Sequence, residues 1–186
     1  AAKKLDKAVN IELKHLGMPH AELSVTLTAS AGGAPSQLGH ETVEFLIRTN
    51  PGQAANPLIK VASGGELSRI SLAIQVITAQ TSETPSLIFD EIDVGIGGGV
   101  AKVVGETLRQ LGQTTQILCV THQAQVAGQG HHHFYVSKSA KSDSTVTSVL
   151  TLKGDQVVKE IARMLAGEEL SDESLAHAQQ LVANFN

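Results

Sequence analysis

Two acidic residues and one histidine follow short apolar runs that have the composition of β-strands. Asp90 and Glu91 come directly after the run 87–89, and His122 comes two residues after the run 116–120. An Asp at such a position can hold a hydrated Mg²⁺. The Glu beside it can accept a proton from an attacking water. We therefore expect a phosphoryl-transfer site in which Asp90 is the metal ligand and Glu91 and His122 are the catalytic residues.

The segment between the two apolar runs explains why these residues would meet. A glycine-rich turn (95–99) and an amphipathic helix that stops at Gly112 separate the runs. Strand, helix and strand, with continuously apolar strands, is typical of a βαβ unit whose parallel strands are buried. Parallel strands end at one edge of the sheet, where open α/β sheets bind ligands. Acids after a strand often serve solubility alone, but an additional histidine at the same edge favours catalysis.

Ser63-Gly64-Gly65-Glu66 precedes another amphipathic helix. The spacing of Ser63 and Glu66 predicts a capping box at the start of that helix. Glycine in a first helical turn costs stability, so the two glycines need a further purpose. Exposed backbone N–H groups at a helix N-terminus bind anions, and glycines allow the anion to approach closely. The tetrad predicts a helix cap that is also a phosphate site.

A phosphate-binding loop is missing from the chain. No Gly-x-x-x-x-Gly-Lys-Ser/Thr occurs, and the glycine-containing stretches at 32–33, 95–99 and 128–130 lack the Lys-Ser/Thr ending. A metal-binding Asp and a catalytic Glu without a phosphate-binding loop make up only half of a nucleotide-hydrolysing site.

The rest of the chain predicts an α/β fold with a mainly parallel sheet, flanking helices and a small β element. Apolar periodicity predicts a first helix, two strands, a hairpin and two closing helices. The expected segments are helix 2–16, strands 23–27 and 43–47, hairpin strands 133–137 and 145–152 around a loop 138–144, and helices around 157–165 and from 171 onward.

Composition limits the function classes. Among the 186 residues, 41% are hydrophobic and 17% are charged, which is typical of a globular chain. A net charge of −4, no Trp, one Tyr and four Phe argue against a nucleic-acid grip by this chain alone. No apolar run approaches the roughly 20 residues that span a membrane, so we expect no membrane partner.

Two further features have unremarkable interpretations. The lone Cys119 lies in an apolar run and is expected to be a buried, reduced thiol of a cytosolic protein. Three adjacent histidines, 131–133, could suggest a metal site. Neighbours in a strand point to opposite faces, however, so an incidental strand edge is favoured.

The order of these motifs resembles the C-terminal half of an ABC-type ATPase head. Within that class the chain looks like the SMC-like group, whose two head lobes are separated in sequence by a long coiled coil, and in particular like the RecN family of bacterial DNA repair proteins. The resemblance covers essentially the whole chain. It is carried by residues 61–70, 88–96, 119–127 and 160–167.

The resemblance implies a role for each motif. Residues 63–66 would be the signature loop, Asp90 the Walker B aspartate, Glu91 the hydrolytic base and His122 the switch histidine. The turn from Asp93 to about Gly98 would be the D-loop, although the family pattern has a Ser where this chain has Gly97. The implied ATP contacts are Ser63, Gly64, Gly65, Glu66, Asp93 and Gly95.

The resemblance also implies a larger assembly. Residues 1–18 would be the end of a coiled-coil helix, and residues 19–186 the C-terminal lobe of the head. The missing phosphate loop would belong to the N-terminal lobe, so this chain would be a fragment that is inactive alone. Two heads would pair as a homodimer around ATP and Mg²⁺ and act in double-strand break repair and recombination in the bacterial cytoplasm, at the nucleoid. Most DNA contact would lie elsewhere in the full protein.

Two alternatives stay open. A structural head could use ATP only to hold two heads together without hydrolysis, but Gln rather than Glu91 would then be expected. An unrelated hydrolase could use His122 as its base, but no Gly-x-Ser-x-Gly nucleophile motif occurs.

Overall fold

A computed structural model describes residues 1–29, 37, 39–61, 63–78, 84–141 and 144–183. Its elements follow one another along the chain as α1 (Ala2–His15), β1 (Glu22–Ala29), β2 (Glu41–Arg48), β3 (Asn56–Pro57), the 3₁₀ turn η1 (Leu58–Lys60), α2 (Gly64–Thr78), β4 (Ser86–Phe89), α3 (Gly98–Leu111), β5 (Gln116–Cys119), α4 (Ala124–Ala127), β6 (His133–Lys141), β7 (Ser144–Leu152), α5 (Asp155–Ala166) and α6 (Asp172–Ala183).

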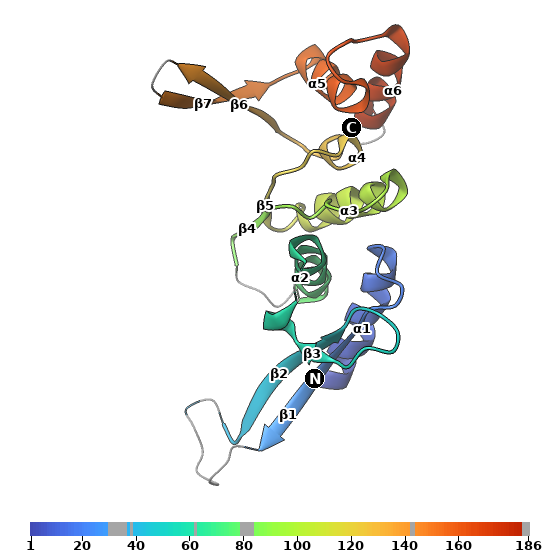
Figure 1. Cartoon of the computed structure of the whole chain (residues 1–186), viewed down its shortest axis with the longest axis vertical. Coiled ribbons are helices and arrows are strands. Elements are labelled where there is room, and N and C mark those ends of the chain that lie inside the picture. The colour runs from blue at the N-terminus through green and yellow to red at the C-terminus, as the bar shows by residue number, and fades with distance from the viewer. Residues whose placement is uncertain (30–36, 38, 62, 79–83, 142–143, 184–186) are drawn as a thin grey trace.

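The elements are stacked along the long axis of the molecule. Figure 1 shows α1 with β1–β3 at one end, α2 and α3 in the middle, and α4–α6 with the β6–β7 hairpin at the other end. One hydrophobic core joins α1, β1, α2, β4 and α3, and a second joins α4, α5 and α6. The fully buried large side chains of the first core include Leu13, Leu23, Ile70 and Val104.

The first helix is attached to the first strand by side-chain bonds to the backbone. The Asn10 amide donates to the Leu23 carbonyl at 2.8 Å and accepts from the Leu23 N–H at 2.7 Å. Asp6 Oδ1 accepts from the Val25 N–H at 2.9 Å. The predicted helix and the predicted strand pair are confirmed, with β1 and β2 antiparallel. The segment 1–18 therefore packs into the first core of the molecule.

The central βαβ unit is confirmed. β4 and β5 are parallel, with Leu87 opposite Ile117 and Phe89 opposite Cys119. The helix between them begins after Gly97 and ends at Gly112, as the glycine positions predict. Among the described strands this is the one parallel pair, and β1–β2–β3 and β6–β7 are antiparallel. The predicted α/β fold is thus confirmed, with parallel pairing in the central unit and antiparallel strands before and after it in the sequence.

The prediction that these strands are buried holds for one face and is wrong for the other. Ile88 is 72% exposed, Val120 is 62% exposed, and Leu118 between them is also exposed. Side chains alternate across a strand, so the opposite face carries the buried Phe89 and packs on the first core. Within the described part of the chain no element covers the outer face, and that is the physical reason for the difference.

The C-terminal hairpin is longer than predicted. Its strands run to Lys141 and resume at Ser144, so most of the predicted loop 138–144 is paired strand. The predicted helices after it are confirmed as α5 and α6. β3, η1 and α4 were not predicted, because elements of two to four residues show no periodicity. No helix in the described ranges combines the length and apolar character needed to cross a membrane.

Candidate functional site

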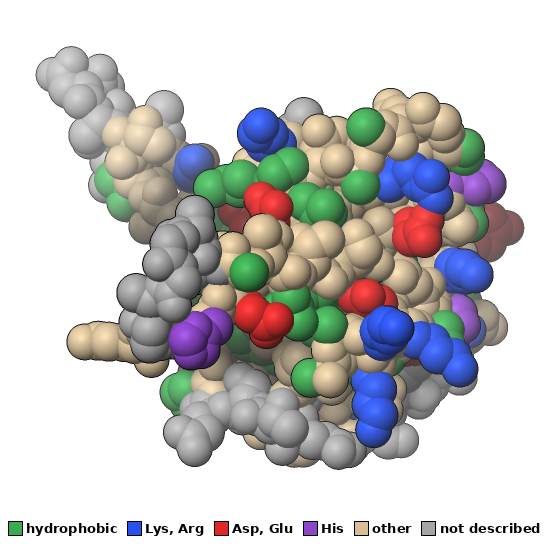
Figure 2. Space-filling model, turned by 90° about the horizontal axis from the view of Figure 1, so that it is seen from below, with side chains coloured by type: hydrophobic (Ala, Val, Ile, Leu, Met, Phe, Trp, Pro, Cys, Tyr) green, Lys and Arg blue, Asp and Glu red, His purple; other side chains and the backbone are tan. Residues whose placement is uncertain are grey.

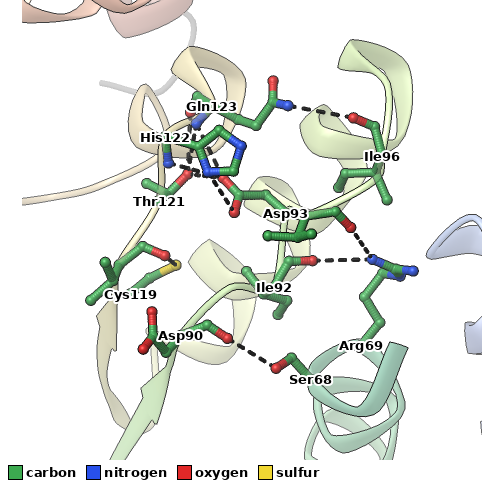
Figure 3. Close-up of polar contacts among 12 residues, drawn as sticks. Ser68, Arg69, Asp90, Ile92, Asp93, Ile96, Cys119, Thr121, His122 and Gln123 are labelled. Atoms are coloured by element: carbon green, nitrogen blue, oxygen red, sulfur yellow. Dashed lines mark hydrogen bonds and ion pairs between the residues drawn. The ribbon is translucent and has the colours of Figure 1, made fainter. Parts of the chain in front are cut away.

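The carboxyl ends of β4 and β5 lie side by side, as the sequence predicts. The Val120 N–H donates to the Phe89 carbonyl at 2.9 Å, so the two strands stay paired to their ends. The residues that follow, Asp90 directly after β4 and His122 beyond β5, therefore leave the sheet at the same edge (Figure 3). Both side chains are exposed.

Glu91 lies in a tight turn that we call the acidic turn (residues 90–96). Its φ of 56° is rare for a residue other than glycine, and its carbonyl accepts from the Val94 N–H at 3.2 Å. The exposed Glu91 carboxylate lies beside the start of α2, because a Cβ built on Gly64 would be 3.1 Å from Glu91 Oε2. The acidic turn therefore meets the N-terminus of α2 within one chain.

Asp90 has an exposed side chain and a fixed backbone. Its carbonyl accepts a hydrogen bond from Ser68 Oγ of α2 at 2.9 Å. In the described ranges no group of three or more His, Cys, Asp or Glu residues could hold a metal ion. Mg²⁺ in phosphoryl-transfer sites is typically held by one or two carboxylates together with phosphates and waters. A single exposed Asp90 fits such a magnesium site, although it would not fit a protein-only metal cage.

Residues 63–66, which we call the Ser63 loop, cap α2. Ser63 Oγ accepts from the Glu66 N–H at 3.4 Å, and the Ser63 carbonyl accepts from the Leu67 N–H at 3.0 Å. Gly65 is buried against the acidic turn: a Cβ there would be 2.9 Å from the Val94 carbonyl oxygen. Gly65 is therefore required by packing within the chain, whereas Ser63 and Gly64 are exposed. Ala62 lies outside the described residues.

Asp93 points inward, to a segment that we call the His122 loop (residues 121–123). Its side chain is 0% exposed. Asp93 Oδ2 accepts from the Thr121 hydroxyl and from the N–H groups of His122 and Gln123, both at 3.1 Å (Figure 3). Asp93 Oδ1 lies 3.5 Å from His122 Nδ1. The sequence predicts Asp93 as an ATP contact, but the structure directs its carboxylate to the chain's own loop.

Gly95 follows in the acidic turn. It is exposed and has a φ of 74°, a left-handed conformation that favours glycine. Gly95 is accordingly needed for the turn, and its contact with ATP stays a prediction.

Arg69 anchors the acidic turn to α2. Its buried Nη1 donates to the carbonyls of Ile92 at 3.4 Å and Val94 at 3.1 Å. Burial lowers the pKa of the Arg69 guanidinium, and the charge of Glu66 opposes that shift. Sequence reasoning missed Ser68, Arg69, Thr121 and Gln123. Their only signal was a place next to a recognised motif, since their partners are distant in sequence.

Cys119 lies under this edge of the sheet. It is half-buried, and burial together with the negative charges of Asp93 and Asp90 raises the pKa of its thiol to about 12. The raised pKa gives a physical reason for the low reactivity that the sequence predicts for this thiol.

Of the three adjacent histidines, His133 is the first residue of β6. Its Nε2 lies 3.2 Å from the Gly130 carbonyl, and burial lowers its pKa.

Relatives of the chain are DNA repair proteins. No protein-family model matches it. The chain is 51% identical over 181 residues to DNA repair protein RecN of Vibrio cholerae, covering 97% of this chain and 32% of that protein. It is 45% identical over 171 residues to DNA repair protein RecN of Deinococcus radiodurans, covering 92% of this chain and 29% of that protein. The chain thus spans about a third of the length of the curated relatives it matches.

Solved structures show the same fold. The Smc head domain with a coiled coil and joint from Pyrococcus yayanosii superposes with a TM-score of 0.59 at 18% identity, covering 86% of this chain and 28% of that one. A structure from work on ATP-driven dimerization and DNA-stimulated activation of SMC ATPases superposes with a TM-score of 0.52 at 16% identity, covering 90% of this chain and 94% of that one. The fold is that of an SMC-type ATPase head, as predicted.

Proposed function

We propose, on the premise that this chain belongs to the RecN family along almost its whole length, that it forms one half of an ATP-hydrolysing head. In this proposal the chain supplies the Ser63 loop, the Walker B aspartate and the hydrolytic base, and it acts in the repair of broken DNA. The observation that carries the proposal is that Asp90, with Glu91 next to it in sequence, and His122 follow the carboxyl ends of the paired parallel strands β4 and β5.

The residues have distinct roles in the proposed reaction. Bound Mg²⁺–ATP would supply the phosphoryl group and the metal charge that offsets its negative oxygens. Asp90, exposed and fixed through Ser68, would hold the metal. The neighbouring Glu91 is then the free carboxylate that can accept the proton of the attacking water. His122, exposed at the same edge, would orient a polar ring nitrogen toward the transferred group.

The Ser63 loop would serve a second head. Ser63 and Gly64 are exposed at the N-terminus of a 15-residue helix, where backbone N–H groups and the helix dipole favour a phosphate. Each of two paired heads would close this loop over a nucleotide held by the other. Because Gly65 and Arg69 fasten the start of α2 to the acidic turn, both halves of the proposed site move as one piece.

The phosphate loop would come from another lobe of the same protein. The outer face of β4 and β5 is apolar and exposed, at Ile88, Leu118 and Val120. Exposed apolar faces of this kind are typical of interfaces. We infer that the phosphate-loop lobe covers this face, and that α1 continues into a coiled coil.

DNA would be held mostly by other parts of the protein. The chain has a net charge of −4, and on the face in Figure 2 most basic side chains lie toward one side, where acidic side chains are interspersed with them. Such a surface offers little of the counterion release that drives nucleic-acid binding. We assign the activity to the bacterial cytoplasm, at the nucleoid.

A comparison of two variants tests the proposal. In a head reunited from this chain and the phosphate-loop lobe, Glu91→Gln should slow single-turnover hydrolysis by roughly 10²–10⁴ while ATP affinity is retained. The ATP-bound pair of heads should then accumulate. Asp90→Asn should weaken Mg²⁺-dependent ATP binding as well. Hydrolysis by Glu91→Gln at the wild-type rate would mean that Glu91 is not the base. A wild-type head that binds ATP but never turns over would favour the purely structural head.

A further inference from the structure

Asp93 is a fully buried side chain that accepts several hydrogen bonds at the site. Asp93 is 0% exposed, and its Oδ2 accepts three hydrogen bonds, all from the His122 loop. A buried carboxylate is costly unless its lone pairs are satisfied. These bonds hold the loop that carries His122, across 28 or more residues of sequence.

The second oxygen of the same carboxylate lies near the ring of His122. Asp93 Oδ1 is buried and has no hydrogen-bond partner within normal geometry. The ring nitrogen Nδ1 of His122 lies 3.5 Å from it, at the outer limit of a hydrogen bond. A proton on Nδ1 would satisfy Oδ1, whereas a bare Nδ1 would place two lone pairs against each other. The carboxylate therefore favours a proton on Nδ1.

We propose that Asp93 is a positioning residue that sets the tautomer and orientation of His122. Oδ2 fixes the loop and Oδ1 directs Nδ1 inward, so Nε2 is the nitrogen that faces outward from a side chain that is 66% exposed. The tautomer and orientation of His122 do not depend on the proposed function. Only the identity of the group that Nε2 would contact rests on it. A histidine whose inner nitrogen is committed to a carboxylate presents a single, predetermined nitrogen to its substrate.

The structure also offers a matched control. His15 Nδ1 lies 3.6 Å from Glu12 Oε2 on α1, a separation close to that at the site. This pair is partly solvated, with the His15 side chain 62% exposed and Glu12 not fully buried. Water can satisfy both partners there, so Glu12 should not dictate the state of His15.

The test is the protonation of the His122 ring, read by nitrogen-15 NMR on the histidine-labelled chain without nucleotide. The chain has eight histidines, and the signals that disappear in His122→Gln belong to His122. In the wild type we expect the proton on Nδ1. In Asp93→Asn the side-chain amide can still accept from the loop, but its NH₂ group now faces Nδ1, so the proton should move to Nε2. For the control, the signals that disappear in His15→Gln belong to His15, and Glu12→Gln should leave the tautomer of His15 unchanged.

A proton on Nε2 in the wild type, or the same tautomer in Asp93→Asn as in the wild type, would overturn the proposal. If Asp93→Asn does not fold, the wild-type spectrum still decides, because it needs no variant.

A second readout links the tautomer to turnover. In the reunited head, Asp93→Asn should lower the single-turnover rate by roughly 10–100-fold with nucleotide affinity unchanged, and it should add nothing in a His122→Gln background. A further loss in that background would show that Asp93 acts by another route and would overturn the proposal. If His122→Gln alone leaves hydrolysis at the wild-type rate, the proposed role of His122 in ATP hydrolysis fails, whereas the ring spectrum continues to decide the role of Asp93.

Discussion

Cys119 shows how burial, together with the charges at the site, shifts the pKa of a neighbouring thiol. Its thiol is half-buried, and burial, Asp93 and Asp90 all disfavour the thiolate. The pKa rises from an ordinary value of 9.0 to about 12. The raised pKa disfavours the reactive thiolate form of the single cysteine beside the proposed site.

We expect Cys119 to react with iodoacetamide far more slowly in the folded chain than in the unfolded chain. At pH 8 the raised pKa leaves roughly 1000-fold fewer thiolates, and the thiolate is the nucleophile. Mass spectrometry of the single cysteine gives the rate directly. Equal rates for the folded and denatured chains would contradict the expectation.

The same shift predicts a pH dependence of stability. The folded pKa lies above the unfolded one, so this contribution is complete below pH 9.0 and is lost as the pH rises toward about 12. The free energy of unfolding should fall more steeply between pH 9.0 and about 12 in the wild type than in Cys119→Ala. Comparing the two proteins separates the contribution of Cys119 from that of other titrating groups.

At the scale of elements, the contact between α2 and the acidic turn decides how the two halves of the site sit together. Arg69 and Ser68 bond to carbonyls of the turn, and Gly65 lets the helix approach its backbone. Gly64, one residue earlier, faces only the end of the Glu91 side chain. The two glycines therefore differ in what an added methyl group would meet.

Gly65→Ala should destabilise the chain by about 1–3 kcal/mol, because its Cβ would lie 2.9 Å from the Val94 carbonyl oxygen, which is backbone. Gly64→Ala is the matched control. Its Cβ would meet Glu91 Oε2 at 3.1 Å, and an exposed side chain can turn away. The control should be neutral or up to about 1 kcal/mol more stable, because Ala favours helix. Urea unfolding of both variants gives the comparison, and equal losses would argue against the close approach.

At the scale of the whole molecule, the outer face of β4 and β5 is the clearest sign of a missing neighbour. It carries Ile88 at 72% exposure on a strand whose other face is packed in the first core. The curated relatives are about three times as long as this chain. Proteins of that length have enough additional chain to form a second lobe that could cover this face.

Ile88→Ser should leave the free energy of unfolding of this chain within about 0.5 kcal/mol of the wild type, because the side chain is already solvated. The same change should weaken binding of the phosphate-loop lobe at least roughly tenfold. Ile59→Ser is the control, since Ile59 in η1 is 92% exposed but lies outside the strand pair. Calorimetric titration with the phosphate-loop lobe gives the affinity of each variant, and urea unfolding gives the free energy of unfolding of this chain. Equal affinities for the two variants would mean that the lobe binds elsewhere.

The sequence by itself predicted most of the elements and singled out the motifs. Asp90-Glu91, the Ser63 loop and His122 are recognisable because their residue types and neighbours are local. The helices and the βαβ order follow from periodicities that extend over one element. For the same reason the parallel pairing of β4 and β5 could be predicted, since a crossover helix dictates it.

Only the tertiary structure decided what these motifs touch. Asp93 is buried against the His122 loop, 28 or more residues away, a contact that the sequence did not predict. Gly65 is needed by the Val94 carbonyl, which no local pattern predicts. Ile88 and Val120 are likewise exposed, although apolar side chains are expected to be buried. Burial depends on which distant segments are present to cover a side chain, and a local pattern records only the tendency to be covered.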